Sequence, residues 1–196
     1  MGQNYTSEMN EHQNPWKTKN SKLIYDNPWI VVHEHEVIHP SGKPGIYGVV
    51  GFKNTAVGII PLDKDLNTWI VGQYRYPLKR YSWEIPEGGA PKHLPLLESA
   101  QRELREETGI EAKDWQPILE VAISNSITDE LGVVYVARDL SFHEAQPEDS
   151  EELVVKKIPF QTLFEMCMRN EITDSLAVNG ILKLKLLLDS GKINNK

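Results

Sequence analysis

The chain has 196 residues, with 21 Lys and Arg against 28 Asp and Glu, a formal net charge of -7 at pH 7 and 40% hydrophobic residues. This length and composition are typical of one globular domain with a real core, and they exclude wholesale disorder. The acidic excess argues against a nucleic-acid partner, because binding along a polyanion needs a basic face. A small anionic ligand bridged by a metal stays possible.

The start of the chain and its cysteine content indicate a compartment. Cys167 is the single cysteine and cannot form an intrachain disulfide, so we expect a reducing, cytoplasmic location. No basic segment followed by an apolar one opens the chain, and no run predicts a membrane span. Residues 1–21 are polar and are predicted to form a mobile arm, or one ordered by a partner subunit. A single folded domain is predicted over residues 22–196.

Short β-rich runs with turn signals between them fill much of this domain. Strands are predicted within residues 22–38, 46–52, 55–62, 68–76, 115–123, 132–142 and 153–159. The runs 55–62 and 68–76 are expected to pair as a hairpin at the centre of a sheet, and 78–95 is expected to be a loop. Helices are predicted over 96–108, 160–169 and 175–188. The pattern predicts a mixed sheet with helices packed on it, an α+β or α/β sandwich.

The helix predicted over 96–108 carries the most informative residues. An apolar face that begins at Leu97 adjoins a face on which Glu103, Glu106 and Glu107 gather, and Gly109 is placed to end the helix. Like charges at these spacings destabilise a helix by a few tenths of a kcal/mol per pair, so a compensating cation is expected. Clustered carboxylates suit Mg²⁺ or Mn²⁺.

A solvated helix face is the alternative to a metal site. Arg102 would then pair with Glu98 and Glu106 at a spacing of four residues, and nothing would bind. The flanking residues decide between the two interpretations.

The segment resembles the Nudix box, G-x5-E-x7-R-E-U-x-E-E-x-G-U, in which U is a bulky aliphatic residue. Its fixed positions are matched by Gly88, Arg102, Glu103, Leu104, Glu106, Glu107, Gly109 and Ile110. The flanks GQYRY, SWEIPEGG and EITDSLAVNGILKL look most like the branch that hydrolyses ADP-ribose and other nucleoside diphosphate sugars.

This resemblance implies both a fold and a reaction. The fold is an α/β/α sandwich with a mixed sheet and an N-terminal β-rich arm. The reaction is Mg²⁺-dependent hydrolysis of the pyrophosphate bond of ADP-ribose or of an ADP- or GDP-sugar, which gives a nucleoside monophosphate and a sugar phosphate. The resemblance also implies a homodimer that pairs through residues 22–52.

By resemblance, Glu103 and Glu107 are the principal metal ligands, and Glu106 bridges or holds a metal-bound water. The backbone carbonyl of Glu87 would complete the coordination. Arg102 would orient Glu103 through a charge-assisted hydrogen bond.

The general base is expected in the acidic loop before the strand at 153–159. Glu151 aligns best with the position of the base, and Glu152 is the alternative. The equal alternative for each residue is that it belongs to an acidic loop and has no catalytic role.

The resemblance also suggests five substrate contacts, each with a structural alternative. Arg75 and Glu84 would face the nucleotide or its terminal sugar, or would form an ordinary ion pair. Trp29 and Tyr47 would stack on the base, or would pack in the core or in a dimer interface. Glu130 would border the site, or belong to a turn.

One position departs from the box, because Leu94 stands where the first Glu is expected. We expect Leu94 to pack under its loop and Glu98 to replace the missing Glu as a partner of Arg102. The departure also leaves open a second function, a Nudix-like module that binds and senses ADP-ribose without hydrolysing it.

Overall fold

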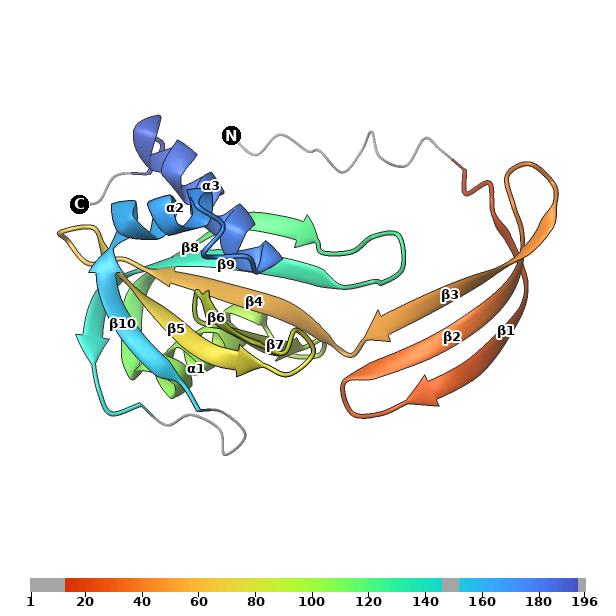
Figure 1. Ribbon diagram of the computed structural model, residues 1–196, viewed down its shortest axis with the longest axis horizontal. Coiled ribbons are helices and arrows are strands. Elements are labelled where there is room, and N and C mark those ends of the chain that lie inside the picture. The colour runs from red at the N-terminus through yellow and green to blue at the C-terminus, as the bar shows by residue number, and fades with distance from the viewer. Residues whose placement is uncertain (1–12, 146–151, 194–196) are drawn as a thin grey trace. The chain divides into compact units, whose positions relative to one another are not determined.

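The computed structural model describes residues 13–145 and 152–193 (Figure 1). The chain divides into two compact units, one of Met1–Phe52 with Ser126–Asp129 and one of Lys53–Asn125 with Glu130–Lys196.

The first unit is a three-stranded antiparallel sheet in the order β1-β2-β3. Its strands are β1 (Lys17–Asp26), β2 (Ile30–Ile38) and β3 (Pro44–Phe52). Strand β1 begins at Lys17, inside the segment that was predicted to be an arm, and all ten of its residues are exposed. The side chain of Asn27 forms the turn between β1 and β2, since its Oδ1 accepts hydrogen bonds from the backbone of Trp29 and Ile30.

The second unit contains two sheets. The mixed sheet has the order β7-β4-β9-β8, in which β4 and β9 are parallel and the other pairs antiparallel. Its strands are β4 (Asn54–Pro61), β7 (Glu87–Pro91), β8 (Ile110–Ala122) and β9 (Leu131–Phe142). The antiparallel sheet has the order β10-β5-β6, with β5 (Asn67–Arg75), β6 (Arg80–Glu84) and β10 (Val154–Pro159).

Helices cover both faces of the mixed sheet (Figure 1). They are α1 (Leu96–Thr108), α2 (Phe160–Met168) and α3 (Ser175–Asp189). Alternate residues of β4 belong to two separate cores, because Val57 and Ile59 pack in the core that contains α1, whereas Ile60 packs in the core that contains α2 and α3. A strand buried on both faces is expected where helices cover a sheet on each side.

The α+β sandwich with a mixed sheet is confirmed, and each predicted helix appears within one residue of its expected ends. Two local predictions are wrong. Strands β4 and β5 do not pair as a hairpin, because β4 pairs with β7 and β9 while β5 pairs with β6 and β10. The segment 78–95 is not one loop, since it contains the short strands β6 and β7. None of the described helices is long and apolar enough to cross a membrane.

Candidate active site

Helix α1 sets its acidic residues against strand β7. Gly109 ends the helix in the left-handed conformation, with φ of 70°, and its N–H donates to the carbonyl of Arg105 at 2.8 Å. Ala100, Leu104 and Glu107 are buried, but Leu97 remains 37% exposed. The predicted apolar face is therefore wrong at Leu97, because the helix turns Glu107 inward toward the sheet.

Glu103 packs directly against the backbone of Gly88 on strand β7. A Cβ atom built on Gly88 would lie 2.2 Å from the Cδ of Glu103, so a side chain at this position would displace the carboxylate. The glycine of the box is thus required by a close approach between a helix side chain and a strand backbone.

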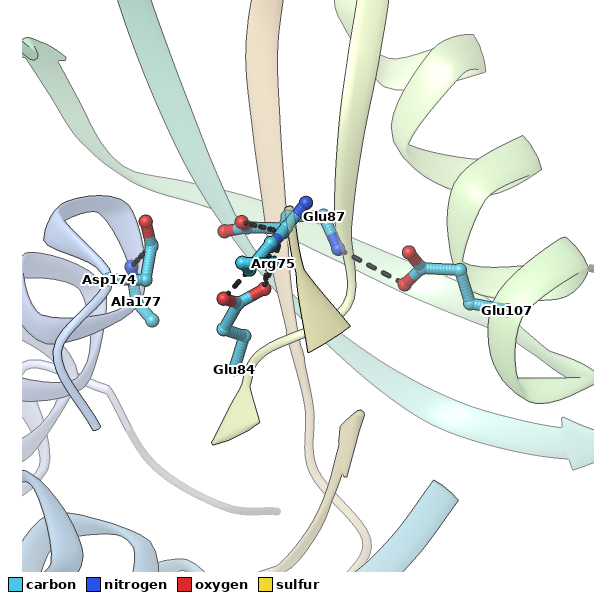
Figure 2. A network of polar contacts seen from close by, with 6 residues as sticks. All are labelled: Arg75, Glu84, Glu87, Glu107, Asp174 and Ala177. Carbon is cyan, nitrogen blue, oxygen red and sulfur yellow. Dashed lines mark hydrogen bonds and ion pairs between the residues drawn. The ribbon is translucent and has the colours of Figure 1, made fainter. Parts of the chain in front are cut away.

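Glu107 is buried, with 2% of its surface exposed. Its Oε2 accepts a hydrogen bond of 3.1 Å from the backbone N–H of Glu87 (Figure 2). Because Glu103 meets Gly88 and Glu107 meets Glu87, two of the box glutamates converge on the same two residues of β7.

Arg102 lies over the exposed side of this cluster. It forms ion pairs with Glu103 at 2.5 Å and with Glu106 at 2.6 Å, and it also donates to the carbonyl of Gly89 at 3.4 Å. The pairing with Glu103 is the hydrogen bond that the resemblance to the Nudix box implied. The carboxylates of Glu103 and Glu106 hold the pKa of Arg102 above its usual range, against the opposing effect of burial.

Strands β5, β6 and β7 bring a second group of charges together (Figure 2). Arg75 donates from Nε to both carboxylate oxygens of Glu84 at 3.0 Å and also contacts Glu84 through Nη2. The same Nη2 contacts Oε1 of Glu87 at 2.9 Å. Glu84 is buried, with 2% of its surface exposed, so the guanidinium of Arg75 neutralises a carboxylate that water barely reaches.

Glu87 faces both groups of charges. Figure 2 shows its backbone nitrogen on the side of Glu107 and its carboxylate on the side of Arg75 and Asp174. Burial raises the pKa of the Glu87 carboxyl well above its usual range, and the carboxylates of Asp174 and Glu84 add to the shift. The Oε2 atom of Glu87 is buried, and no donor of the described residues reaches it.

Two expectations about the departure from the box are wrong. Leu94 does not pack under its loop, because 45% of its surface is exposed. It lies in a turn in which its own backbone N–H donates to the carbonyl of Pro91 at 2.9 Å. Glu98 does not replace the missing Glu, since Glu103 and Glu106 are the carboxylates that pair with Arg102 in the described part of the chain. The ion-pair partners of Arg102 therefore both follow it in helix α1.

The remaining predicted residues lie elsewhere in the two units. In the first unit, Trp29 is 67% exposed in the β1–β2 turn, and the hydroxyl of Tyr47 donates to the carbonyl of Ser126 at 2.6 Å. Trp29 therefore does not pack in the core of this chain. In the second unit, the carbonyl of Glu130 accepts from Ile123 at 3.0 Å and closes the β8–β9 loop. Glu151 lies outside the described residues, and Glu152 is exposed before β10.

The donors along α1 and β7 fit a hard divalent cation. The glutamates of α1 supply carboxylate oxygens next to the backbone of Glu87 and Gly88, and hard cations prefer carboxylate and carbonyl oxygens. Within residues 13–145 and 152–193, no group of three His, Cys, Asp or Glu side chains is arranged to hold a metal ion. The carboxylates of Glu103 and Glu106 instead form ion pairs with Arg102. A bound cation would compete with that guanidinium for the same oxygens.

Sequence reasoning missed Asp174, which lies beside the charges of β5–β7. Its Oδ1 accepts a hydrogen bond of 2.8 Å from Ala177 and caps helix α3. An aspartate directly before a predicted helix is a recognised capping signal, but capping alone gives no hint of a neighbouring Glu87.

Two family profiles match the chain. One is described as the NUDIX domain and matches residues 52–174, and the other is described as the nucleoside diphosphate sugar hydrolase N-terminal domain and matches residues 16–50. The first covers more than half of the chain and includes α1 and β7. The chain therefore belongs to the Nudix family of hydrolases, whose members generally use divalent metal ions.

Individual proteins agree with this assignment. An ADP-ribose pyrophosphatase of Mycobacterium tuberculosis (strain ATCC 25618 / H37Rv) is 32% identical over 149 residues, which are 72% of this chain and 69% of that protein. An ADP-ribose pyrophosphatase of Bacillus subtilis (strain 168) is 32% identical over 132 residues, 67% of this chain and 71% of that protein. A methanol dehydrogenase activator of Bacillus methanolicus is 31% identical over 128 residues, 65% of this chain and 69% of that protein.

A solved structure supports the fold. The crystal structure of an ADP compounds hydrolase superposes with a TM-score of 0.81 at 18% identity, and the match covers 93% of this chain and 100% of that chain.

Proposed function

We propose that this protein hydrolyses the pyrophosphate bond of a nucleoside diphosphate sugar, such as ADP-ribose or an ADP- or GDP-sugar. The products are a nucleoside monophosphate and a sugar phosphate. The observation that carries the proposal is the convergence of Glu103 and Glu107 on the backbone of β7, within a chain whose relatives include ADP-ribose pyrophosphatases.

The proposed cofactor is Mg²⁺, with Mn²⁺ as a possible substitute. Glu103, Glu106 and Glu107 would hold it together with the carbonyl of Glu87, all of them hard oxygen donors. When bound, such an ion neutralises charge on the phosphoryl oxygens and lowers the pKa of a coordinated water. Arg102 would orient Glu103 through the ion pair at 2.5 Å.

The proposed general base is Glu151, or Glu152 in its place. Either carboxylate would take the proton of the attacking water. The support is their position just before β10, in the acidic stretch that the resemblance identifies.

Substrate contacts are proposed for each unit by itself. Trp29 and Tyr47 would stack on the base, and Trp29 exposes the aromatic face that stacking needs. Arg75, Glu84 and Glu130 would belong to the substrate side of the second unit. The ion pairing of Arg75 with Glu84 supports a role in shaping this site, because it fixes both side chains.

A homodimer paired through residues 22–52 is also proposed. Every residue of β1 is exposed, and Leu23, Ile24 and Tyr25 each expose more than half of their surface. An exposed apolar edge strand favours pairing with another chain. Light scattering at micromolar concentration would measure a dimer, and a monomeric mass would contradict this proposal. A cytoplasmic location is proposed on the single Cys167, and fractionation that placed the protein elsewhere would contradict it.

One assay tests the activity and the substrate class together. The protein is incubated with Mg²⁺ and with ADP-ribose, an ADP-hexose or a GDP-hexose, and a phosphatase releases phosphate from the products only. We expect turnover of at least one compound, loss of turnover when EDTA removes the metal, and recovery with Mg²⁺ or Mn²⁺. If none is hydrolysed while calorimetry detects binding of ADP-ribose, the protein is a sensor rather than an enzyme.

A further inference from the structure

A cavity of about 440 Å³ lies between helix α1 and strand β8 in the second unit. This volume falls within the range for small-molecule sites, roughly 300–1,000 Å³. The residues that line it come from the exposed side of α1 and from the first half of β8, and they are Gln101, Arg102, Arg105, Glu111, Ala112 and Trp115. Of these six, Arg102 also belongs to the candidate active site.

The lining is locally positive, although the chain as a whole carries a net charge of -7. The guanidiniums of Arg102 and Arg105 stand against one lining carboxylate, that of Glu111. The two arginines are three residues apart on α1 and therefore share one face of the helix. Two planar guanidiniums on one face suit a phosphate, whose oxygens accept hydrogen bonds from several N–H groups at once.

Both guanidiniums already pair with carboxylates, but these pairs are exposed. Arg105 donates from Nη1 to Glu111, while Arg102 donates from Nη1 to Glu106 and from Nη2 to Glu103. The Nε atom of each arginine makes none of these bonds and carries a further N–H donor. Because exposed ion pairs contribute little, a doubly charged phosphate can share the two guanidiniums with their present partners.

Trp115 gives the cavity an aromatic wall. Its indole N–H donates to the carbonyl of Ala112 at 2.9 Å, and its ring meets that of Tyr135 edge-on, with 6.2 Å between the ring centroids. The half-buried ring also packs against the core under α1, so these contacts hold it in one orientation. A ring that is already fixed can stack on a planar base with little loss of side-chain freedom.

We propose that this cavity is a second nucleotide site, which binds a nucleoside monophosphate with its phosphate at Arg102 and Arg105 and its base on Trp115. The inference goes beyond the proposed function, because the site lies between α1 and β8 and needs no substrate turnover. A nucleoside monophosphate is also a product of the proposed reaction. The cavity therefore gives that class of product a binding site apart from the metal ligands.

Occupancy of the cavity is expected to favour binding of a cation at the acidic cluster. The phosphate adds negative charge beside Arg102, which pairs with the proposed metal ligands Glu103 and Glu106. The guanidinium then competes less strongly with a cation for those carboxylates. By linkage, the nucleotide and the cation each raise the affinity for the other.

Equilibrium dialysis with AMP in the presence of EDTA tests the site in wild type and in Arg105→Met. The matched control is Arg169→Met, because Arg169 is 54% exposed and pairs with Glu171, much as Arg105 is 53% exposed and pairs with Glu111. We expect one AMP site whose dissociation constant rises by about tenfold or more in Arg105→Met, as for the loss of a charged hydrogen bond. It should stay within about twofold of wild type in Arg169→Met. Equal AMP binding by all three proteins would overturn the proposal.

The role of the base is tested with ribose 5-phosphate, which keeps the sugar and phosphate of AMP and lacks the base. Wild type should bind it at this site at least about tenfold more weakly than AMP, because stacking on Trp115 is lost. Trp115→Leu, checked for folding by thermal unfolding, should bring the affinity for AMP down to that for ribose 5-phosphate. Equal affinities of wild type for the two compounds would overturn the nucleotide site and leave an anion site.

The linkage is tested by calorimetric titration of Mg²⁺ with and without AMP. The dissociation constant of Mg²⁺ should fall by about fivefold or more with AMP in wild type, and by clearly less in Arg105→Met. The same fall in both proteins would overturn the linkage. The dialysis needs neither metal nor turnover, so a protein that hydrolyses nothing but shows the Arg105-dependent AMP site would contradict the hydrolase proposal alone. Normal hydrolysis without that site would contradict this inference alone.

Discussion

The backbone N–H of Glu87 donates a hydrogen bond of 3.1 Å to Oε2 of Glu107, so the acidic helix α1 is tied to the strand that carries the box glycine. The contact gives one oxygen of a carboxylate with 2% of its surface exposed a donor, which lowers the cost of burying it. It also places the carboxylate of Glu107 beside the backbone of β7.

Glu107→Gln is expected to lower kcat for a nucleoside diphosphate sugar by about a hundredfold or more, as removal of one strong electrostatic contributor does in other enzymes. The amide oxygen can still accept from Glu87, so the fold should persist. Steady-state kinetics and thermal unfolding measure the two effects. The control is Glu98→Gln, an exposed glutamate of the same helix, which should retain wild-type activity. Full activity of Glu107→Gln would show that the metal ligands are misassigned.

Gly88→Ala is expected to weaken activation by Mg²⁺. The new Cβ would lie 2.2 Å from the Cδ of Glu103, and the carboxylate would have to leave its place against β7. The Mg²⁺ concentration that gives half-maximal activity should rise about tenfold or more. Gly48→Ala is the control, because a Cβ there meets no atom within 4 Å. An unchanged Mg²⁺ dependence in Gly88→Ala would mean that Glu103 does not need this position.

Arg75→Met should lower the free energy of unfolding by roughly 3 kcal/mol, because it leaves the buried carboxylate of Glu84 without its counter-charge. Urea denaturation followed by tryptophan fluorescence measures the loss, and the double variant with Glu84→Gln should recover part of it. Arg105→Met is the matched control, since Arg105 and Glu111 form an exposed pair worth about 1 kcal/mol or less. Equal losses in the two single variants would show that burial of Glu84 adds nothing.

Asp63→Asn should reveal a pH-dependent contribution to stability. Burial of Asp63 is outweighed by hydrogen bonds from Lys157 and Asn67, which lower its pKa to about 2. A lowered pKa in the folded state stabilises the protein above the unfolded value of 3.8, and this stabilisation is lost as the pH falls toward about 2.

The variant should therefore be less stable than wild type by about 1 kcal/mol at pH 7, after allowance for solvent screening. Chemical denaturation between pH 7 and pH 2 should show this difference shrinking below pH 4. Asp65→Asn, an exposed change two residues away, should remain close to wild type. A difference that persists unchanged at pH 2 would attribute the effect to packing rather than charge.

The parts of the fold that depend on residues close together in the sequence could be predicted from the sequence. The limits of α1 and the left-handed Gly109 follow from helical spacing and from a glycine directly after it. The pairing of β4 could not be predicted, because β4 and β5 are adjacent in the chain but pair with strands from distant segments. The strands β6 and β7 are five residues each, too short for a periodic signal.

The candidate site shows the same division. The box glutamates could be identified by their spacing along one helix, and the partnership of Arg102 with Glu103 followed from the resemblance to the Nudix box. The association of Glu87 with Asp174 could not, since it joins the start of β7 to the start of α3. The burial of Leu97 and Leu94 was predicted wrongly, because apolar residues near the start of a helix are often exposed.

The parallel pairing of β4 with β9 has a consequence for how the protein is made. Ala56 pairs with Gly132 and Pro61 with Ala137, so the middle of the mixed sheet joins segments far apart in the chain. Closing so large a loop is entropically slow, and such pairings delay folding. During synthesis, α1 leaves the ribosome before β9. The core residues that β9 contributes under α1 are therefore missing when α1 first emerges. Until β9 follows, the acidic helix has only part of its core, and folding of the catalytic unit is expected to follow synthesis of β9.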